Sequence, residues 1–155
     1  MNTEQQLREW LLLNSERATG LSKLKWETSL HGAYEMLSRD VQEQMLYEPE
    51  KVKVPVVGRI DLIFTHQGKR YCSELKLLDY TSGNFWDALK ILGYTALYNW
   101  QNKKSYKPAV MIPINKIKLE HHIIAGKLNF TIFGITKIKD EYIIEIVKAD
   151  KFKKN

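Results

Sequence analysis

Two apolar runs separated by a short turn sequence limit the folds open to this chain more than any other feature. Residues 59–64 and 70–77 alternate apolar and polar side chains, and they flank His66-Gln67-Gly68-Lys69. Glycine tolerates the positive φ that a two-residue hairpin loop requires. The pattern therefore predicts a β-hairpin that turns at Gln67 and Gly68.

A symmetric turn at these two residues also predicts the register of the hairpin. One face pairs apolar residues and belongs in the core: Ile60 with Leu75, Leu62 with Ser73, and Phe64 with Tyr71. The other face pairs Arg59 with Lys76, Asp61 with Glu74, and Ile63 with Cys72. A slip of one residue would exchange the two faces, so the conclusions below depend on this register.

Two acids face each other in this register. Directly opposed side chains have Cβ atoms about 4.5–5.5 Å apart, and like charges there destabilise a sheet. Either a proton or a divalent cation would offset the repulsion between Asp61 and Glu74, and Mg²⁺ favours carboxylates together with water and phosphate oxygens. Lys76 follows on the same face. The pattern predicts a cation site, with a solvated polar face as the alternative.

Periodicity assigns the remaining segments to helices and strands. We expect helices over residues 3–13, 23–41 and 85–102, the second capped by Ser22 and buried through a stripe that includes Trp26 and Leu30. We expect further strands over residues 52–57, 109–114, 130–138 and 142–147. The order predicts an α/β fold with a mixed central β-sheet flanked by helices.

Length and composition exclude several classes of protein. The 155 residues suit a single domain, with a core over about residues 24–114 and basic strands over 115–155. The chain has no apolar stretch of membrane-spanning length and no secretory signal pattern at its start. Cys72, the single cysteine, excludes a disulfide framework and a cysteine-rich zinc site. We expect a cytoplasmic protein without a membrane partner.

Positive charge is concentrated in the second half of the chain. The net charge is +6, and residues 81–155 carry 13 Lys and Arg against 6 Asp and Glu. Residues 1–80 carry 11 against 12. A basic half predicts a polyanionic partner, most often nucleic acid, whereas a solvated lysine-rich surface is the alternative.

The two predicted strands that carry Asp61 and Glu74 resemble the metal-binding motif of the PD-(D/E)XK nuclease superfamily. Residues 58–63 (Gly-Arg-Ile-Asp-Leu-Ile) look like its first metal-binding strand, and residues 71–76 (Tyr-Cys-Ser-Glu-Leu-Lys) look like its second. A long helix follows in the expected place. Ile60 stands where the proline of the motif's name would be. Lys90 stands where RecB-like members carry the glutamine of Gln-x-x-x-Tyr, with Tyr94 as the tyrosine.

The resemblance implies a restriction-endonuclease-like core and a Mg²⁺-dependent nuclease, with Mn²⁺ as a substitute metal. Asp61, Glu74 and the backbone carbonyl of Leu75 would bind the metal, and Lys76 would polarise the attacking water. A glutamate from the helix before the sheet often assists, and Glu27 is our choice, with Glu35 second. The substrate would be DNA rather than RNA, and a homodimer would serve to cut both strands.

Three alternatives stay open. The same fold could carry a nucleic-acid-binding or assembly module that does not cleave. Cys72 with a histidine could form a thiol nucleophile, although a lone cysteine on a strand is far more often packing. One face of the third predicted helix, containing Asp87, Lys90, Tyr94 and Tyr98, could look into the site or into solvent.

Overall fold

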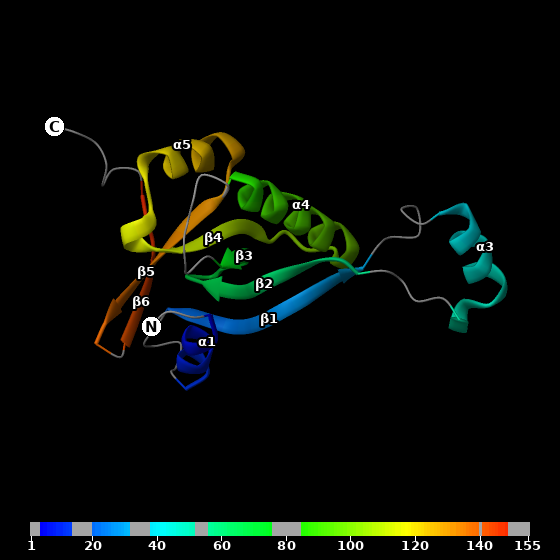
Figure 1. Cartoon of the computed structure of the whole chain (residues 1–155), viewed down its shortest axis with the longest axis horizontal. Coiled ribbons are helices and arrows are strands. Elements are labelled where there is room, and N and C mark those ends of the chain that lie inside the picture. Colours follow the sequence, from blue (N-terminus) through cyan, green and yellow to red (C-terminus); the bar gives the residue numbers. More distant parts are fainter. Residues whose placement is uncertain are drawn as a thin grey trace.

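Six strands form one mixed sheet with helices on both of its faces (Figure 1). This computed structural model describes residues 4–13, 20–31, 38–51, 56–75, 85–139 and 141–148. The strands lie in chain order across the sheet: β1 (Leu21–His31), β2 (Val56–His66), β3 (Lys69–Leu75), β4 (Lys107–Pro113), β5 (Thr131–Ile138) and β6 (Glu141–Ile146). The helices are α1 (Glu4–Leu13), α3 (Arg39–Tyr47), α4 (Phe85–Asn102) and α5 (Leu119–Leu128), with short turns η2 (Pro49–Lys51) and η4 (Ile114–Lys116). The predicted α/β class with a mixed, helix-flanked sheet is confirmed.

The strand directions follow from the connections. β1, β2 and β3 pair antiparallel, and β5 and β6 do the same. The pairs β3–β4 and β4–β5 are parallel. Parallel neighbours need a crossover segment, and the helices α4 and α5 lie in the chain between the strands of these two pairs. The two crossovers place α4 and α5 on the same face of the sheet (Figure 1).

The predicted hairpin turn and its register are confirmed over five pairs. Leu62 pairs with Ser73 at one end of the β2–β3 ladder and His66 pairs with Lys69 at the other. Gln67 and Gly68 both have positive φ, of 48° and 77°, which is the geometry of a type I′ turn. This turn matches the twist of the strands it joins and therefore holds the register.

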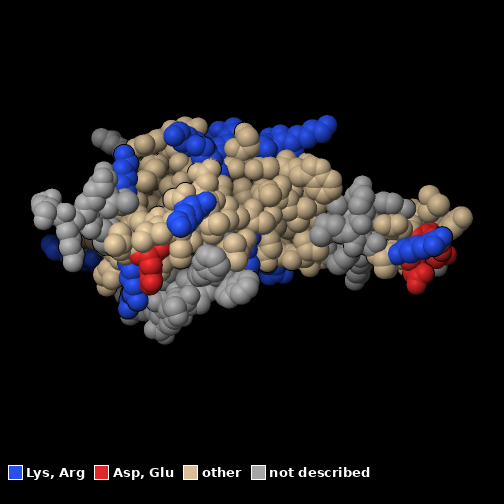
Figure 2. All heavy atoms as spheres, turned by 90° about the horizontal axis from the view of Figure 1, so that it is seen from above, with Lys and Arg blue, Asp and Glu red and all other residues tan. Residues whose placement is uncertain are grey.

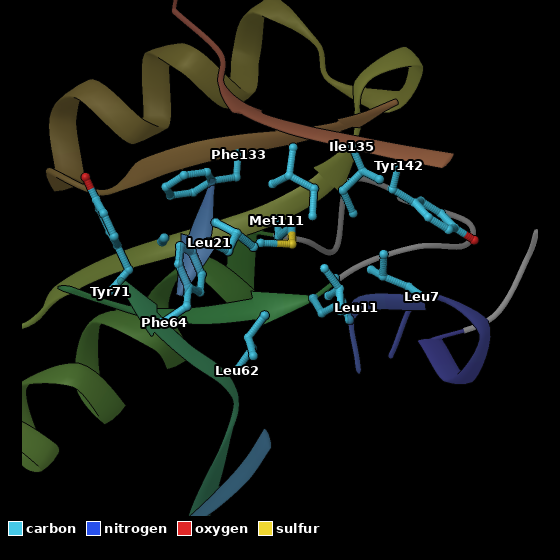
Figure 3. Packing of buried hydrophobic residues seen from close by; sticks show 13 residues of the cluster. Leu7, Leu11, Leu21, Leu62, Phe64, Tyr71, Met111, Phe133, Ile135 and Tyr142 are labelled. Atoms are coloured by element: carbon cyan, nitrogen blue, oxygen red, sulfur yellow. The ribbon is translucent and has the colours of Figure 1, made fainter. Parts of the chain in front are cut away.

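Both faces of the sheet are buried. The α1-side core consists of Leu7, Leu11, Leu21, Leu62, Phe64, Tyr71, Leu75, Ala109, Met111, Phe133, Ile135, Tyr142 and Ile144. Figure 3 shows Leu7 and Leu11 entering it from α1. The α4-side core consists of Leu30, Ile60, Ile63, Cys72, Ile91, Val110, Ile112, Ile117, Ala125, Ile132 and Val147.

The helix predicted over residues 23–41 is wrong over its described first part, which is strand β1. The alternation that decides this lies in Leu24-Lys25-Trp26-Glu27-Thr28, where Lys25 and Glu27 are exposed and the other three are half-buried. Ser22 pairs with Thr65 in the ladder with β2 instead of capping a helix. Residues 32–37 lie outside the described part of the chain. Helix α3 begins after its cap Ser38 and shares only residues 39–41 with the predicted helix.

The C-terminal region is not made of strands alone. Residues 119–128, inside the segment predicted as basic strands, form α5. Its β-branched and histidine-rich sequence has weak helical propensity. The helix instead depends on burying His121, His122 and Ala125, and it ends at Asn129 in the left-handed conformation. The predicted strands at 130–138 and 142–147 are confirmed as β5 and β6.

The first helix and α4 match their predicted ranges, but the four-residue and three-residue spacing of Trp86, Leu89, Gly93, Leu97 and Trp100, which predicts the buried stripe of α4, does not give the observed one. Trp100 and Gly93 are exposed, whereas Ile91 and Thr95 are buried. Helix α3 extends away from the sheet (Figure 1), and it contains no buried residue among those described. Within the described ranges, no helix combines the length and the apolar character needed to cross a bilayer.

Candidate active site

Asp61 lies where strands β2 and β3 part. The last ladder pair before this point is Leu62 with Ser73, so Asp61 and Glu74 occupy the next position on each strand. There the backbone N–H of Leu75 donates to Asp61 Oδ2 at 2.9 Å. The Asp61 carboxylate thus takes the place of a backbone partner. The carboxylate contacts Leu75, the residue that follows Glu74 in β3. Leu75 is also the residue whose backbone carbonyl was predicted as a metal ligand.

The alternation of faces breaks at this position. Leu62 and Phe64 lie in the α1-side core as predicted, but Ile60 lies in the α4-side core together with Ile63. Three of the predicted pairs are not part of the described ladder: Asp61–Glu74, Ile60–Leu75 and Arg59–Lys76. The side-chain hydrogen bond of Asp61 explains the change, because it replaces regular pairing at the point where the strands separate.

Glu74 is buried, with 3% of its surface exposed. It pairs with Val110 of β4, whereas the next residue, Leu75, pairs with Met111. Side chains of paired residues project to the same face of a sheet. Because Val110 belongs to the α4-side core and Met111 to the α1-side core, Glu74 projects toward the α4 side.

Asp61 opens instead into a polar hollow beside α1. The hollow has a volume of about 240 Å³, and its described lining residues are Gln5 and Arg8 of α1, Trp26 and Glu27 of β1, and Asp61. Arg8 Nη1 lies 3.5 Å from Glu27 Oε1. The Arg8 guanidinium also lies 5.1 Å from the centre of the Trp26 ring. The hollow therefore combines two carboxylates with one arginine.

Glu27 reaches this hollow from a strand, although the sequence analysis assigned it to a helix. It is exposed, and its backbone has a positive φ of 50°. Arg8 was missed in the sequence because an arginine in an amphipathic helix looks like any solvated charge. The resemblance places an assisting residue on the helix before the sheet. That helix is α1, which contains Arg8, and not residues 23–41.

The structure brings some of the proposed site residues together and leaves others apart. Asp61 and Glu27 line one hollow, and Asp61 also contacts the backbone of Leu75. Glu74 is adjacent along β3 but is not among the described lining residues of the hollow. Lys76 and Glu35 lie outside the described residues. Within the described ranges, no three His, Cys, Asp or Glu side chains form a metal-binding group.

The face of α4 that contains Asp87, Lys90, Tyr94 and Tyr98, predicted to look either into the site or into solvent, is directed partly at the sheet. A Cβ at Gly58 of β2 would overlap the Tyr94 ring, so the ring occupies the space above this glycine. Tyr98 packs against the α4-side core and lies 5.3 Å from Tyr106, measured between ring centres. Lys90 is exposed, with its ammonium 6.0 Å from the Tyr94 ring. The side chain of Asp87 lies outside the described residues.

Cys72 is unsuited to nucleophilic chemistry. Its side chain is fully buried in the α4-side core, and burial raises the pKa of the thiol to about 12. The thiolate is the nucleophilic form, so the group is inert near neutral pH. This geometry disfavours the cysteine-hydrolase alternative.

Comparison with protein-family models, curated proteins and solved structures finds no match to this chain.

Proposed function

We propose that this chain is a metal-dependent nuclease that hydrolyses phosphodiester bonds in DNA, built on a restriction-endonuclease-like core. The observation that carries the proposal is the hydrogen bond from the Leu75 N–H to Asp61 Oδ2 at the open end of the β2–β3 hairpin. It holds one acid of the motif against the strand that carries the other acid. Helix α1 before the sheet and helix α4 after β3 agree with the order of elements that the resemblance implies.

The donor chemistry of the site suits a hard divalent cation. Asp61 and Glu27, which line the same hollow, and the carbonyl of Leu75 would supply oxygen ligands of the kind that Mg²⁺ prefers. Glu74 would join them once its side chain turned from the α4 side toward this hollow. The bound metal would lower the pKa of a water molecule and offset negative charge that develops on the phosphate. The Leu75 amide orients the Asp61 carboxylate, and Lys76 would polarise the attacking water.

Cleavage assays on plasmid and oligonucleotide DNA with Mg²⁺ or Mn²⁺ test this proposal. Asp61→Asn, Glu74→Gln and Lys76→Ala should each slow cleavage by about 100-fold or more, because each removes a metal ligand or a charge that stabilises the transition state. Glu141→Gln is the matched control, since Glu141 is an exposed acid on β6, and it should cleave at the wild-type rate. Equal cleavage by all variants, or none by the wild type, would contradict the proposal.

A nucleic-acid-binding module without cleavage is the second candidate. The observation that favours it is the separation of the acids, because Glu74 projects toward the α4 side while Asp61 and Glu27 line the hollow beside α1. DNA binding by every variant, together with no cleavage by any protein including the wild type, would support this candidate.

A further inference from the structure

Five cations surround a second hollow at the opposite end of the hairpin. Lys69 and Arg70 follow the β2–β3 turn. Lys103 and Lys104 come from the connection between α4 and β4, and Lys107 is the first residue of β4. The hollow has a volume of about 510 Å³. Figure 2 shows Lys and Arg side chains over the face that carries α4 and α5, with acidic side chains at α3 and at one place on the body.

The charge of this basic hollow is not neutralised by the described residues. No acidic or aliphatic side chain is among the described residues that line it. The ion pairs found within the described ranges, Arg8–Glu27 and Arg39–Glu43, involve none of its five cations. Like charges held close together repel each other, and a bound anion relieves the repulsion. The hollow is therefore electrostatically suited to an anion with several negative oxygens.

The backbone around the basic hollow is held in place before any ligand binds. The Asn99 side chain donates to the Tyr106 carbonyl at 2.9 Å and accepts from the Tyr106 N–H at 2.8 Å. The Lys104 N–H donates to the Asn99 carbonyl at 3.0 Å. The type I′ turn at Gln67 and Gly68 fixes the opposite wall. A loop fixed in this way loses little further entropy when a ligand binds.

An aromatic side chain lies among the cations. Tyr106 lines the hollow, and the Arg70 guanidinium lies 5.7 Å from the centre of its ring. Proteins that bind nucleic acids combine two features: cations that follow the phosphate backbone, and aromatic or guanidinium planes on which bases stack. A membrane-binding surface would instead place apolar side chains beside its cations, and the described lining of this hollow has no aliphatic residue.

We propose that the basic hollow binds the phosphodiester backbone of a nucleic acid. It lies at the turn end of β3, and the proposed metal site lies at the other end. Arg70 and Glu74 are four residues apart along this strand, which is about 13 Å at ~3.3 Å per residue. That distance corresponds to about four nucleotide steps along a duplex strand at ~3.4 Å each. The binding proposal goes beyond cleavage and does not depend on it, because its residues are separate from the acids.

Binding of labelled oligonucleotides, single-stranded and duplex, measured by fluorescence anisotropy in EDTA tests this proposal without any cleavage. Lys103→Ala combined with Lys104→Ala should weaken binding by about tenfold at moderate salt and reduce the slope of log affinity against log salt by about 1.5 to 2. Arg70→Gln, which leaves the α4–β4 connection intact, should also weaken binding. Lys116→Ala combined with Lys127→Ala removes two exposed charges that do not line the hollow, so this control should stay within about twofold of the wild type.

Three results would overturn the proposal. The wild type could fail to bind either oligonucleotide. The control variant could lose as much affinity as the Lys103/Lys104 variant, which would mean that only net charge matters. Vesicles rich in anionic lipid could bind more tightly than DNA with the same dependence on Lys103 and Lys104, which would assign the hollow to a membrane surface. Thermal unfolding of each variant shows that it is folded before binding is measured.

Discussion

The two ends of the β2–β3 hairpin differ in charge and in construction. At the turn end, a regular ladder and a type I′ turn hold Lys69 and Arg70 beside three further lysines. At the open end, the strands part, and the Asp61 side chain bonds the Leu75 backbone in place of a ladder partner. The ends of one hairpin can therefore differ in charge, with basic side chains gathered at the turn and carboxylates at the open end, at a spacing set by the length of the strand.

Metal removal should give the largest difference between the two ends of the hairpin, because it should abolish cleavage and leave DNA binding almost unchanged. With EDTA present, cleavage of plasmid DNA should fall below detection, because the carboxylates lose the cation that activates water. Oligonucleotide affinity should change by less than about twofold, since the basic hollow binds phosphate directly. Gel-based cleavage and anisotropy on the same samples measure both effects. Cleavage that persists in EDTA would show that the open end of the hairpin does not act through a metal.

A substitution near the open end should destabilise the fold. Gly58→Ala would place a methyl group against the Tyr94 ring, and such overpacking costs about 1–3 kcal/mol. Gly93→Ala is the matched control on α4, where a Cβ would meet no atom within 4 Å. That change should stabilise the helix by about 0.5–1 kcal/mol. Urea unfolding measures both, and equal effects of the two substitutions would contradict the packing of Tyr94 on Gly58.

Acid should destabilise the protein through buried histidines, one of which lies at the turn end. His66 pairs with Lys69, and burial lowers the pKa of His66 as well as the pKa values of His121 and His122. The unfolded chain therefore binds protons more readily than the folded chain. The free energy of unfolding should fall as pH drops from 7.5 to 5.5, by up to about 1.4 kcal/mol per pH unit for each such proton.

The histidine effect is checked by urea unfolding across this pH range. His66→Gln removes one of the three titrating groups, so its free energy of unfolding should depend less on pH than that of the wild type. A pH dependence unchanged by this substitution would show that His66 does not contribute to it.

Cys72, midway along β3, should give the smallest effect. Because burial raises the pKa of its thiol to about 12, the folded protein should resist iodoacetamide at pH 8, while the urea-unfolded protein should react. Mass spectrometry after timed labelling distinguishes these outcomes. Cys72→Ser should leave DNA cleavage unchanged. Rapid labelling of the folded protein would mean that the strand between the two ends opens readily.

Much of the fold could be predicted because its signals are local. The hairpin register follows from alternation and from Gly68, and the range of α4 follows from a long apolar and aromatic segment. Strand β1 was missed because the four-residue spacing of Trp26 and Leu30 fits one face of a helix. In the strand these residues pack on opposite faces of the sheet, Trp26 against the α1-side core and Leu30 in the α4-side core. Ile63 and Cys72 were assigned to the same face as the polar pair Asp61–Glu74, yet they are buried because α4 covers that face of a central strand.

The candidate site could be predicted only in part. Asp61 and Glu74 were predicted as a facing pair from the hairpin register, but this pair is not part of the described ladder, and the two side chains lie on different sides of the sheet. Arg8 and the five cations of the basic hollow were not found as groups, because their members come from segments distant in sequence. No periodicity along the chain reports that α1 lies beside β1, or that the α4–β4 connection lies beside the hairpin turn.

By itself, the sequence determined which residues form the hairpin, where it turns and which acids reach its open end, since these depend on neighbouring residues and on the permissive backbone of glycine. Long-range packing, in contrast, directs Asp61 toward Arg8 and Glu27, directs Glu74 toward α4, and brings five cations together at the turn. The physical reason is that helix packing and strand crossover select the faces of a sheet, and these long-range contacts leave no regular pattern in the chain.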